Sequence, residues 1–252
     1  MVSVTLLGSA QDGGVPQAGS ANSEELQKRY PVAIGLVDSD GGRHLFDVSR
    51  YLAEQLQIWG QTGVDSIFLT HAHIGHVDGL TLFGKEVMNC QGITLNCSKI
   101  MHDLIKNTPI WSIMVDQGVF TLKTNNFVKL PGVTVEAIEI PHRAELSDMH
   151  AYIIKADKSL LYLPDHDTWR ETLNGHDLRA WLNHLEIDIA LIDGTFFSKD
   201  ELKNRKQEEI PHPPVEQTLE MLGERREGDG EIVFIHLNPV SYTHLRAHET
   251  DR

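Results

Sequence analysis

The sequence predicts a single α/β domain, and three observations lead to this prediction. The chain has 252 residues, of which 40% are hydrophobic and 23% are charged, a composition that allows one sizeable buried core. Short runs of apolar and β-branched residues, typical of strands, recur along most of the chain. Between them lie segments whose apolar residues repeat with the period of a helix. Strand pairs joined by turns, with helices interspersed, favour sheets covered by helices.

The expected elements follow one another in a mixed order that leaves several α/β arrangements open. Pro214 stands before a segment in which Val215, Leu219 and Leu222 share one helical face, and proline is well suited to a helix start. The predicted strands are 2–7, 32–37, 44–46, 66–69, 93–96, 133–140, 151–155, 160–163, 187–192 and 232–236. The predicted helices are 50–59, 80–88, 99–107, 178–185 and 215–225.

The charge and composition exclude several classes of function. The net charge of −14 argues against nonspecific binding of nucleic acid or an anionic membrane surface. No apolar run approaches the ~20 residues of a membrane span, and no leader sequence precedes the first strand, so we expect a cytoplasmic protein. Cys90 and Cys97 are too few for a disulfide framework, and we expect buried thiols. A small-molecule substrate fits these limits, and the oligomeric state stays open.

Three histidines follow a predicted strand within six residues. They are His71, His73 and His76, in the sequence T-H-A-H-I-G-H. Neutral imidazole is the commonest protein ligand for zinc and related metals, and a loop can bring an H-x-H pair to one ion. The third histidine can complete that site or face a second ion. The alternative is a run of exposed or core histidines, but the small residues Ala72 and Gly75 favour a ligand loop.

This stretch resembles the H-x-H-x-D-H signature of the metallo-β-lactamase superfamily, with Gly75 where that family has aspartate. Residues 7–17, 191–197 and 209–213 are similar to a branch near the pyrroloquinoline-quinone biosynthesis B protein. The resemblance implies a four-layer αβ/βα sandwich. The branch often carries a structural zinc on cysteines after its opening glycine loop, but residues 18–23 contain no cysteine, so we expect that zinc to be absent.

The resemblance also implies a set of metal ligands at the ends of several strands. We expect zinc, as one or two ions, with iron or manganese as alternatives. The first site would use His71, His73 and His142. The second would use His76, Asp165 and His236, with Asp165 bridging both ions.

The missing aspartate at position 75 should weaken the second site. Asp78 and His166 are candidates to compensate, although Asp78 is also placed to cap the helix predicted from Leu80, and His166 suits a supporting or substrate-contacting role. Replacing Gly75 by aspartate should tighten the second site if the loop leaves room for a carboxylate.

Further polar residues are expected around the ligands. Asp47 follows a strand and matches a family aspartate that supports the histidine loop, and Asp193 is a second candidate for such support, since metal-bound histidines usually donate their other N–H to a partner. His212 is a candidate pocket residue.

Three functions remain open at this point. The leading one is hydrolysis of an ester, amide, thioester or phosphodiester in a small molecule, because a bound metal lowers the pKa of water toward ~7. Asp165 would orient the attacking oxygen, and His166 or His212 would donate a proton to the leaving group. The second is oxygenation by non-haem iron, held by His76, His236 and Asp165 as two histidines and one carboxylate. The third is a non-catalytic metal-binding protein.

The two ends of the chain differ in character. Residues 1–240 are expected to form the metallo-β-lactamase-like domain. Residues 241–252 lack apolar periodicity and resemble the translation of a sequencing adapter, so we expect them to be foreign to the domain and to bind no metal.

Overall fold

The computed structural model describes residues 1–19, 27–199, 201 and 210–239. Residues 241–252, which we expect to be foreign, lie outside this description, as does residue 240. The described chain builds two six-stranded sheets with the orders β1-β2-β3-β4-β5-β6 and β12-β11-β10-β9-β8-β7. The first contains β1 (Ser3–Gly8), β2 (Ala33–Val37), β3 (Arg43–Phe46), β4 (Ser66–Phe68), β5 (Ile93–Asn96) and β6 (Phe120–Lys123). The second contains β7 (Phe127–Leu130), β8 (Val133–Ile140), β9 (Met149–Lys155), β10 (Ser159–Leu163), β11 (Ile189–Asp193) and β12 (Glu231–Ile235).

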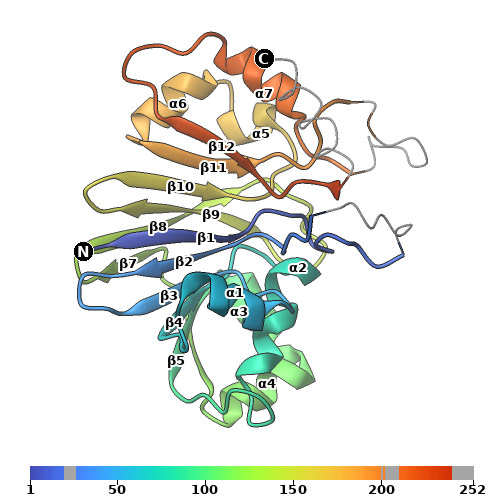
Figure 1. The fold of residues 1–252 in the computed structure, drawn as a ribbon, viewed down its shortest axis with the longest axis vertical. Helices are drawn as coiled ribbons and strands as arrows, with labels where there is room; N and C mark the ends of the chain where they lie inside the picture. The colour runs from blue at the N-terminus through green and yellow to red at the C-terminus, as the bar shows by residue number, and fades with distance from the viewer. Residues whose placement is uncertain (20–26, 200, 202–209, 240–252) are drawn as a thin grey trace.

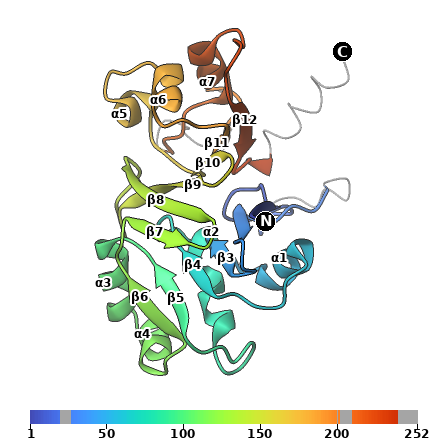
Figure 2. The same cartoon turned by 90° about the vertical axis from the view of Figure 1, so that its left-hand side faces the viewer.

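Helices lie at the two ends of the molecule, with the strands between them (Figures 1 and 2). The first sheet shares a core with α1 (Leu52–Trp59), α3 (Lys99–Asn107) and α4 (Pro109–Asp116). The second shares a core with α5 (Trp169–Leu173), α6 (Leu178–His184) and α7 (Val215–Leu222). The expected four-layer sandwich is therefore confirmed.

The inner faces of the two sheets pack through a cluster of aromatic rings. Phe46 and Phe68 stack with ring centroids 4.7 Å apart, and Tyr152 meets Phe46 edge-on at 5.3 Å. Tyr162 lies edge-on to Phe46 at 6.2 Å. These contacts fix the two sheets against each other directly beneath the ends of β3, β4 and β10, where the predicted site residues lie.

The prediction of a helix over 80–88 was wrong. The chain forms a one-turn helix, α2 (Ile74–Val77), and then a 3₁₀ helix, η1 (Asp78–Phe83). A Cβ atom on Gly79 would lie 2.1 Å from the carbonyl oxygen of Ser49, so this segment packs too tightly against its neighbour for a side chain there. Five elements were not predicted: α2, α4, α5, β6 and β7, each of eight residues or fewer.

Parallel strands carry the site. Strand β3 pairs in parallel with β4, and β11 pairs in parallel with both β10 and β12. The carboxyl ends of parallel strands meet at one edge of a sheet, where α/β proteins commonly bind ligands. Within the described residues, the helices are too short or too polar to cross a bilayer.

Candidate metal centre

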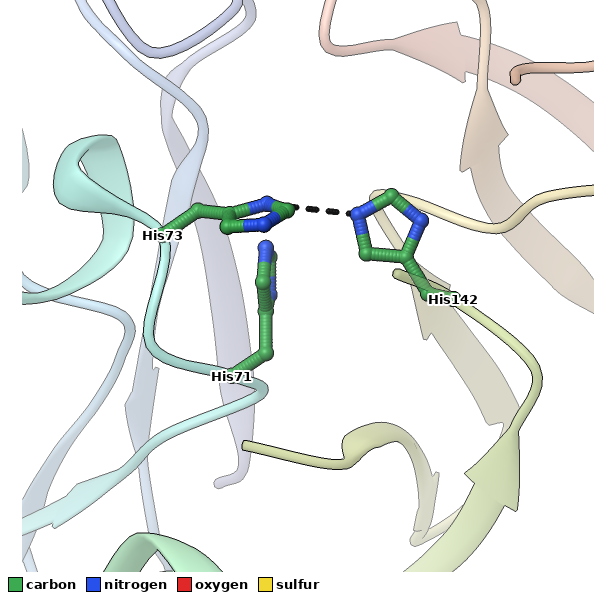
Figure 3. A group of neighbouring side chains, drawn as sticks. All are labelled: His71, His73 and His142. Atoms are coloured by element: carbon green, nitrogen blue, oxygen red, sulfur yellow. Dashed lines mark hydrogen bonds between the residues drawn. The ribbon is translucent and has the colours of Figure 1, made fainter. Parts of the chain in front are cut away.

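Three histidines converge from two segments that are far apart in the sequence. His71 and His73 follow β4, and His142 follows β8, with the three rings turned toward one another (Figure 3). His142 Nε2 is 3.3 Å from His73 Nδ1, and the centroid of the His71 ring is 4.5 Å from that of His73 and 5.2 Å from that of His142. Two nitrogens that share one tetrahedral zinc at its usual bond length are about 3.3 Å apart. The trio is therefore spaced as the ligands of one ion.

A second group adjoins the first through the carboxylate of Asp165. Asp165 Oδ2 lies 3.6 Å from His71 Nε2 and 3.1 Å from His76 Nε2. Its other oxygen, Oδ1, lies 3.3 Å from His236 Nδ1. Asp165 follows β10 and His236 follows β12, so the sheet register brings them together. Through Oδ2 this carboxylate thus faces His71 Nε2 of the first group and His76 Nε2 of the second.

Asp12, which was not predicted as a ligand, also lies at this second group. Its Oδ1 is 3.6 Å from His76 Nε2, and Asp12, His76 and His236 bring one ligand atom each within 4.8 Å of one another. The residue belongs to the glycine-containing loop after β1. In the sequence, only the position of this acidic residue beside two glycines in a loop could have indicated a ligand.

Asp47 contacts His76 directly and His71 through the hydroxyl of Thr70. This carboxylate is fully buried and accepts hydrogen bonds from His76 Nδ1 at 2.8 Å, from the backbone N–H of Thr70 at 2.8 Å and from the hydroxyl of Tyr162 at 3.0 Å. The hydroxyl of Thr70 contacts both Asp47 at 2.9 Å and His71 Nδ1 at 2.9 Å. These contacts place protons on Nδ1 of His71 and His76, so Nε2 of each ring is the nitrogen that a metal would bind.

Asp193 holds histidines on the other side of the site. Its carboxylate accepts the hydroxyl of Thr195 at 2.7 Å, and that hydroxyl lies 2.8 Å from His236 Nδ1. The other Asp193 oxygen is 2.7 Å from His212 Nδ1. A further supporting carboxylate, Asp167, was not predicted and lies 3.0 Å from His142 Nδ1.

The residues present fit a metal cofactor, because several buried polar atoms have no other partner. His71 Nε2, His236 Nε2 and Asp165 Oδ2 are buried and make no hydrogen bond within the described part of the protein. Leaving such an atom unpaired costs about 1–3 kcal/mol. All three atoms belong to the groups described above, and a bound cation would satisfy each of them.

The protonation of the histidines suits the same conclusion. Burial lowers the pKa of His71 and of His73, and lowers that of His142 to about 4, so these rings are neutral near pH 7. His76 behaves differently. Burial opposes its protonation, but Asp47 and Asp165 outweigh that effect and raise its pKa well above the ordinary value. The second group therefore attracts positive charge.

Two of the predicted residues lie apart from the ligand groups. The side chain of Asp78 accepts a hydrogen bond from Arg50 and caps no helix, so the expected N-cap was wrong, and Asp78 belongs to none of the described groups of ligand atoms. His166 is fully buried with its ring centroid 4.2 Å from that of Trp169, and burial lowers its pKa to about 4. A ring that is neutral at pH 7 is poorly suited to donate a proton.

Comparison with known proteins shows the family of the chain. A family model described as "Beta-lactamase superfamily domain" matches residues 43–237, most of the chain. The chain belongs to the beta-lactamase superfamily. Its fold is the metallo-β-lactamase fold, as the resemblance of the histidine motif predicts.

Solved structures support the fold over the whole chain. Zn(2+)-bound PqqB from Methylobacterium extorquens has a TM-score of 0.76 and 20% identity, covering 99% of this chain and 95% of that one. A diphosphatase from the PhnP family has a TM-score of 0.70 and 18% identity, covering 98% and 91%. The short form of human tRNase Z has a TM-score of 0.60 and 17% identity, covering 94% and 93%. Identities this low show the fold alone.

One curated protein also matches over a short stretch. The octanoyltransferase of Porphyromonas gingivalis (strain ATCC BAA-308 / W83) is 32% identical over 80 residues, which is 30% of this chain. The matched part spans 16% of that protein's length, so its activity has no bearing on the site described above.

Proposed function

We propose that this protein is a metal-dependent hydrolase that cleaves a phosphodiester or diphosphate bond in a small anionic molecule. The observation that carries the proposal is the arrangement of two ligand groups around one carboxylate, Asp165. Two metals held in this way clamp the attacking and leaving oxygens of a displacement at phosphorus. The diphosphatase and tRNase Z among the structural neighbours share the fold.

The residues of the chain would divide the work as follows. His71, His73 and His142 would hold one ion, while His76 and His236 would hold the other. Zinc bound there would lower the pKa of water and polarise the attacked oxygen. Asp165, buried between the two groups, would orient the attacking water through the carboxylate oxygen that faces it.

His212 is the residue that we propose to donate a proton to the leaving group. Its Nδ1 is held by Asp193 at 2.7 Å, and Asp165 Oδ1 lies 3.6 Å away. Burial opposes protonation of His212, but the charge of Asp193 and its hydrogen bond outweigh burial and raise the pKa of the ring. We prefer His212 to His166 as the proton donor, because the pKa of His166 is lowered and its ring is neutral near pH 7.

An anionic substrate fits the charges at the rim of the site. Arg143 directly follows His142, its side chain is 33% exposed, and its Nε atom lies 4.0 Å from Glu145 Oε1. A guanidinium in this position can pair with a phosphate oxygen. The net charge of −14 disfavours a polyanion such as RNA, so a small phosphate compound is preferred.

The test compares Asp165→Asn with Asp157→Asn. Asp157 is exposed in the connection between β9 and β10, away from the site, and serves as the matched control. With zinc or manganese and bis(p-nitrophenyl) phosphate as substrate, Asp165→Asn should lose at least about 100-fold in kcat/KM, because even residues that only support ligands cost about 10–100-fold. The control should keep wild-type turnover. Wild-type activity in Asp165→Asn at normal metal content would refute the role of Asp165.

The oxygenase function remains a second candidate. His76 and His236 with one carboxylate form the set of two histidines and one acid that suits iron(II). Oxygen consumption by the iron-loaded protein, measured with phenolic substrates in parallel with the phosphodiester assay, separates the two enzymes. Metal binding with neither activity on a broad panel of esters, thioesters and amides would favour a non-catalytic protein.

A further inference from the structure

The loop at Gly75 raises a question that the family pattern leaves open. The second group of ligands lacks the aspartate that the signature places at this position, and Asp78, the nearest acidic residue along the chain, is paired with Arg50 instead. A site with two histidines and a shared carboxylate would hold its ion less firmly than one with a further anionic ligand. Asp12, from a distant part of the chain, lies beside the histidines of this group.

The Asp12 side chain occupies the space that a side chain at position 75 would need. A Cβ atom built on Gly75 would lie 2.4 Å from Asp12 Oδ1 and 2.4 Å from Asp12 Cα. Real Cβ atoms do not approach other atoms so closely, and the second of these contacts is with the backbone. The backbone N–H of Gly75 donates to Asp12 Oδ1 at 3.2 Å. Glycine at 75 and aspartate at 12 are therefore two parts of one arrangement.

The loop that carries Asp12 is tied to the end of β12, which carries His236. Ala10 forms a parallel bridge with Leu237, and the backbone N–H of Gln11 donates to the carbonyl of Leu237 at 3.2 Å. The side chain of Asn238 donates to Gln11 at 3.2 Å. Asp12 is thus held beside His236 by contacts that do not involve its own carboxylate.

The ligand atoms of this group lie close enough together to bind one cation. His236 Nε2 is buried and makes no hydrogen bond within the described residues, while His236 itself is 3% exposed. Asp12 Oδ1 lies 3.6 Å from His76 Nε2, and ligands that share one zinc at angles near 110–120° are about 3.3–3.6 Å apart. A water molecule would satisfy the lone pair of His236 alone, whereas a cation would bind His236 together with His76 and Asp12.

We propose that Asp12 is the carboxylate ligand of the second metal ion, replacing from the β1–β2 loop the aspartate that the family signature places at position 75. The site then contains Asp12, His76, His236 and the shared Asp165, two histidines and two carboxylates. This inference builds on the metal-dependent function proposed above. It also corrects the expectation that Gly75→Asp would tighten the second site, because the added side chain must displace Asp12.

The test measures zinc binding rather than turnover. The metal-free protein is titrated with zinc against a chromophoric chelator, which yields the stoichiometry and both dissociation constants. Asp12→Asn preserves the shape of the side chain and should weaken the second zinc at least about tenfold, the lower limit seen when even a supporting residue is removed, while leaving the first unchanged. Asp40→Asn, in the exposed turn between β2 and β3, is the matched control and should bind both ions as the wild type does.

Two further variants test the carboxylate and the space around it. Asp12→Gly should lose the second ion, because position 12 then carries no carboxylate. Gly75→Asp alone should bind the second zinc more weakly than the wild type. Circular dichroism and melting of the metal-free proteins verify that each variant is folded.

The proposal is overturned if Asp12→Asn binds both zinc ions with unchanged constants, or if Gly75→Asp alone tightens the second. These results are independent of the hydrolase assay. A protein that binds the second zinc through Asp12 but cleaves no phosphodiester would refute the proposed function and leave this ligand assignment intact.

Discussion

Asp47 offers the sharpest test of how the site is organised, because one buried carboxylate orients histidines of both ligand groups. It accepts hydrogen bonds from His76 Nδ1, the Thr70 backbone N–H, the Thr70 hydroxyl and the Tyr162 hydroxyl. We consider the change Asp47→Asn, which keeps the size of the side chain. Asp47 has φ of 60°, and asparagine tolerates this left-handed conformation, whereas Asp47→Ala would add about 1–2 kcal/mol of backbone strain.

An amide at position 47 cannot accept all of these hydrogen bonds. If its NH₂ group replaces Oδ1, it faces the backbone N–H of Thr70, which cannot turn away. If it replaces Oδ2, it faces His76 Nδ1, and the ring must then carry its proton on Nε2, where a metal would bind. The first case leaves a buried donor unpaired, at about 1–3 kcal/mol of stability. The second removes a ligand atom from the metal site.

We therefore expect Asp47→Asn to weaken zinc binding by about 10–100-fold, equivalent to roughly 1.4–2.7 kcal/mol. Zinc titration against a chelator measures this loss, and urea unfolding of the metal-free protein measures stability separately. Tyr162→Phe is the matched control, since it removes a hydrogen bond to the same carboxylate without facing a histidine. It should cost about 0.5–1.5 kcal/mol of stability and leave zinc affinity near that of the wild type. Wild-type zinc affinity in folded Asp47→Asn would refute the reasoning.

Two further predictions concern regions away from the metal centre. Asp65 accepts two hydrogen bonds from the guanidinium of Arg43, at 2.9 Å each, and they lower the pKa of its carboxyl below the ordinary 3.8. The ionised carboxylate therefore stabilises the folded protein above pH 3.8, and this contribution is lost as the pH falls through the lower pKa of the folded state. Asp65→Asn should thus lower Tm by about 1–3 °C at pH 7, and a difference that persists undiminished at pH 2 would contradict this cause. Cys97 is 7% exposed, and burial raises the pKa of its thiol to about 12. Mass spectrometry after alkylation at pH 8 should show Cys97 unmodified in the native protein and modified after denaturation, whereas rapid native labelling would mean that the strand end opens.

Much of the histidine loop was predictable because its geometry is local. His71, His73 and His76 follow one strand within six residues, so a short loop is enough to bring their rings together. The same locality explains the prediction of most strands, each marked by its own apolar pattern. Strands β6 and β7 were missed because four residues with alternating exposure carry too short a pattern. The helix expected over 80–88 failed because the close approach of Gly79 to Ser49 is a tertiary contact.

The family resemblance added His142, Asp165 and His236 as candidate ligands, and the structure decides how they meet. Their convergence depends on the register of β8, β10 and β12 and on the packing of two sheets, which no local pattern encodes. The supporting role of Asp167, which holds His142, arises in the same way.

The sequence by itself determined the class of fold and the histidine loop, since both follow from short-range patterns of apolar and ligand residues. Only the tertiary structure decided which carboxylate faces the second group of ligands. Asp12 reaches it because the β1–β2 loop is hydrogen-bonded to the end of β12, at the other end of the described chain. In the sequence, glycine at position 75 indicates the loss of a ligand. In the folded protein, the absence of a side chain at position 75 leaves the space that Asp12 occupies.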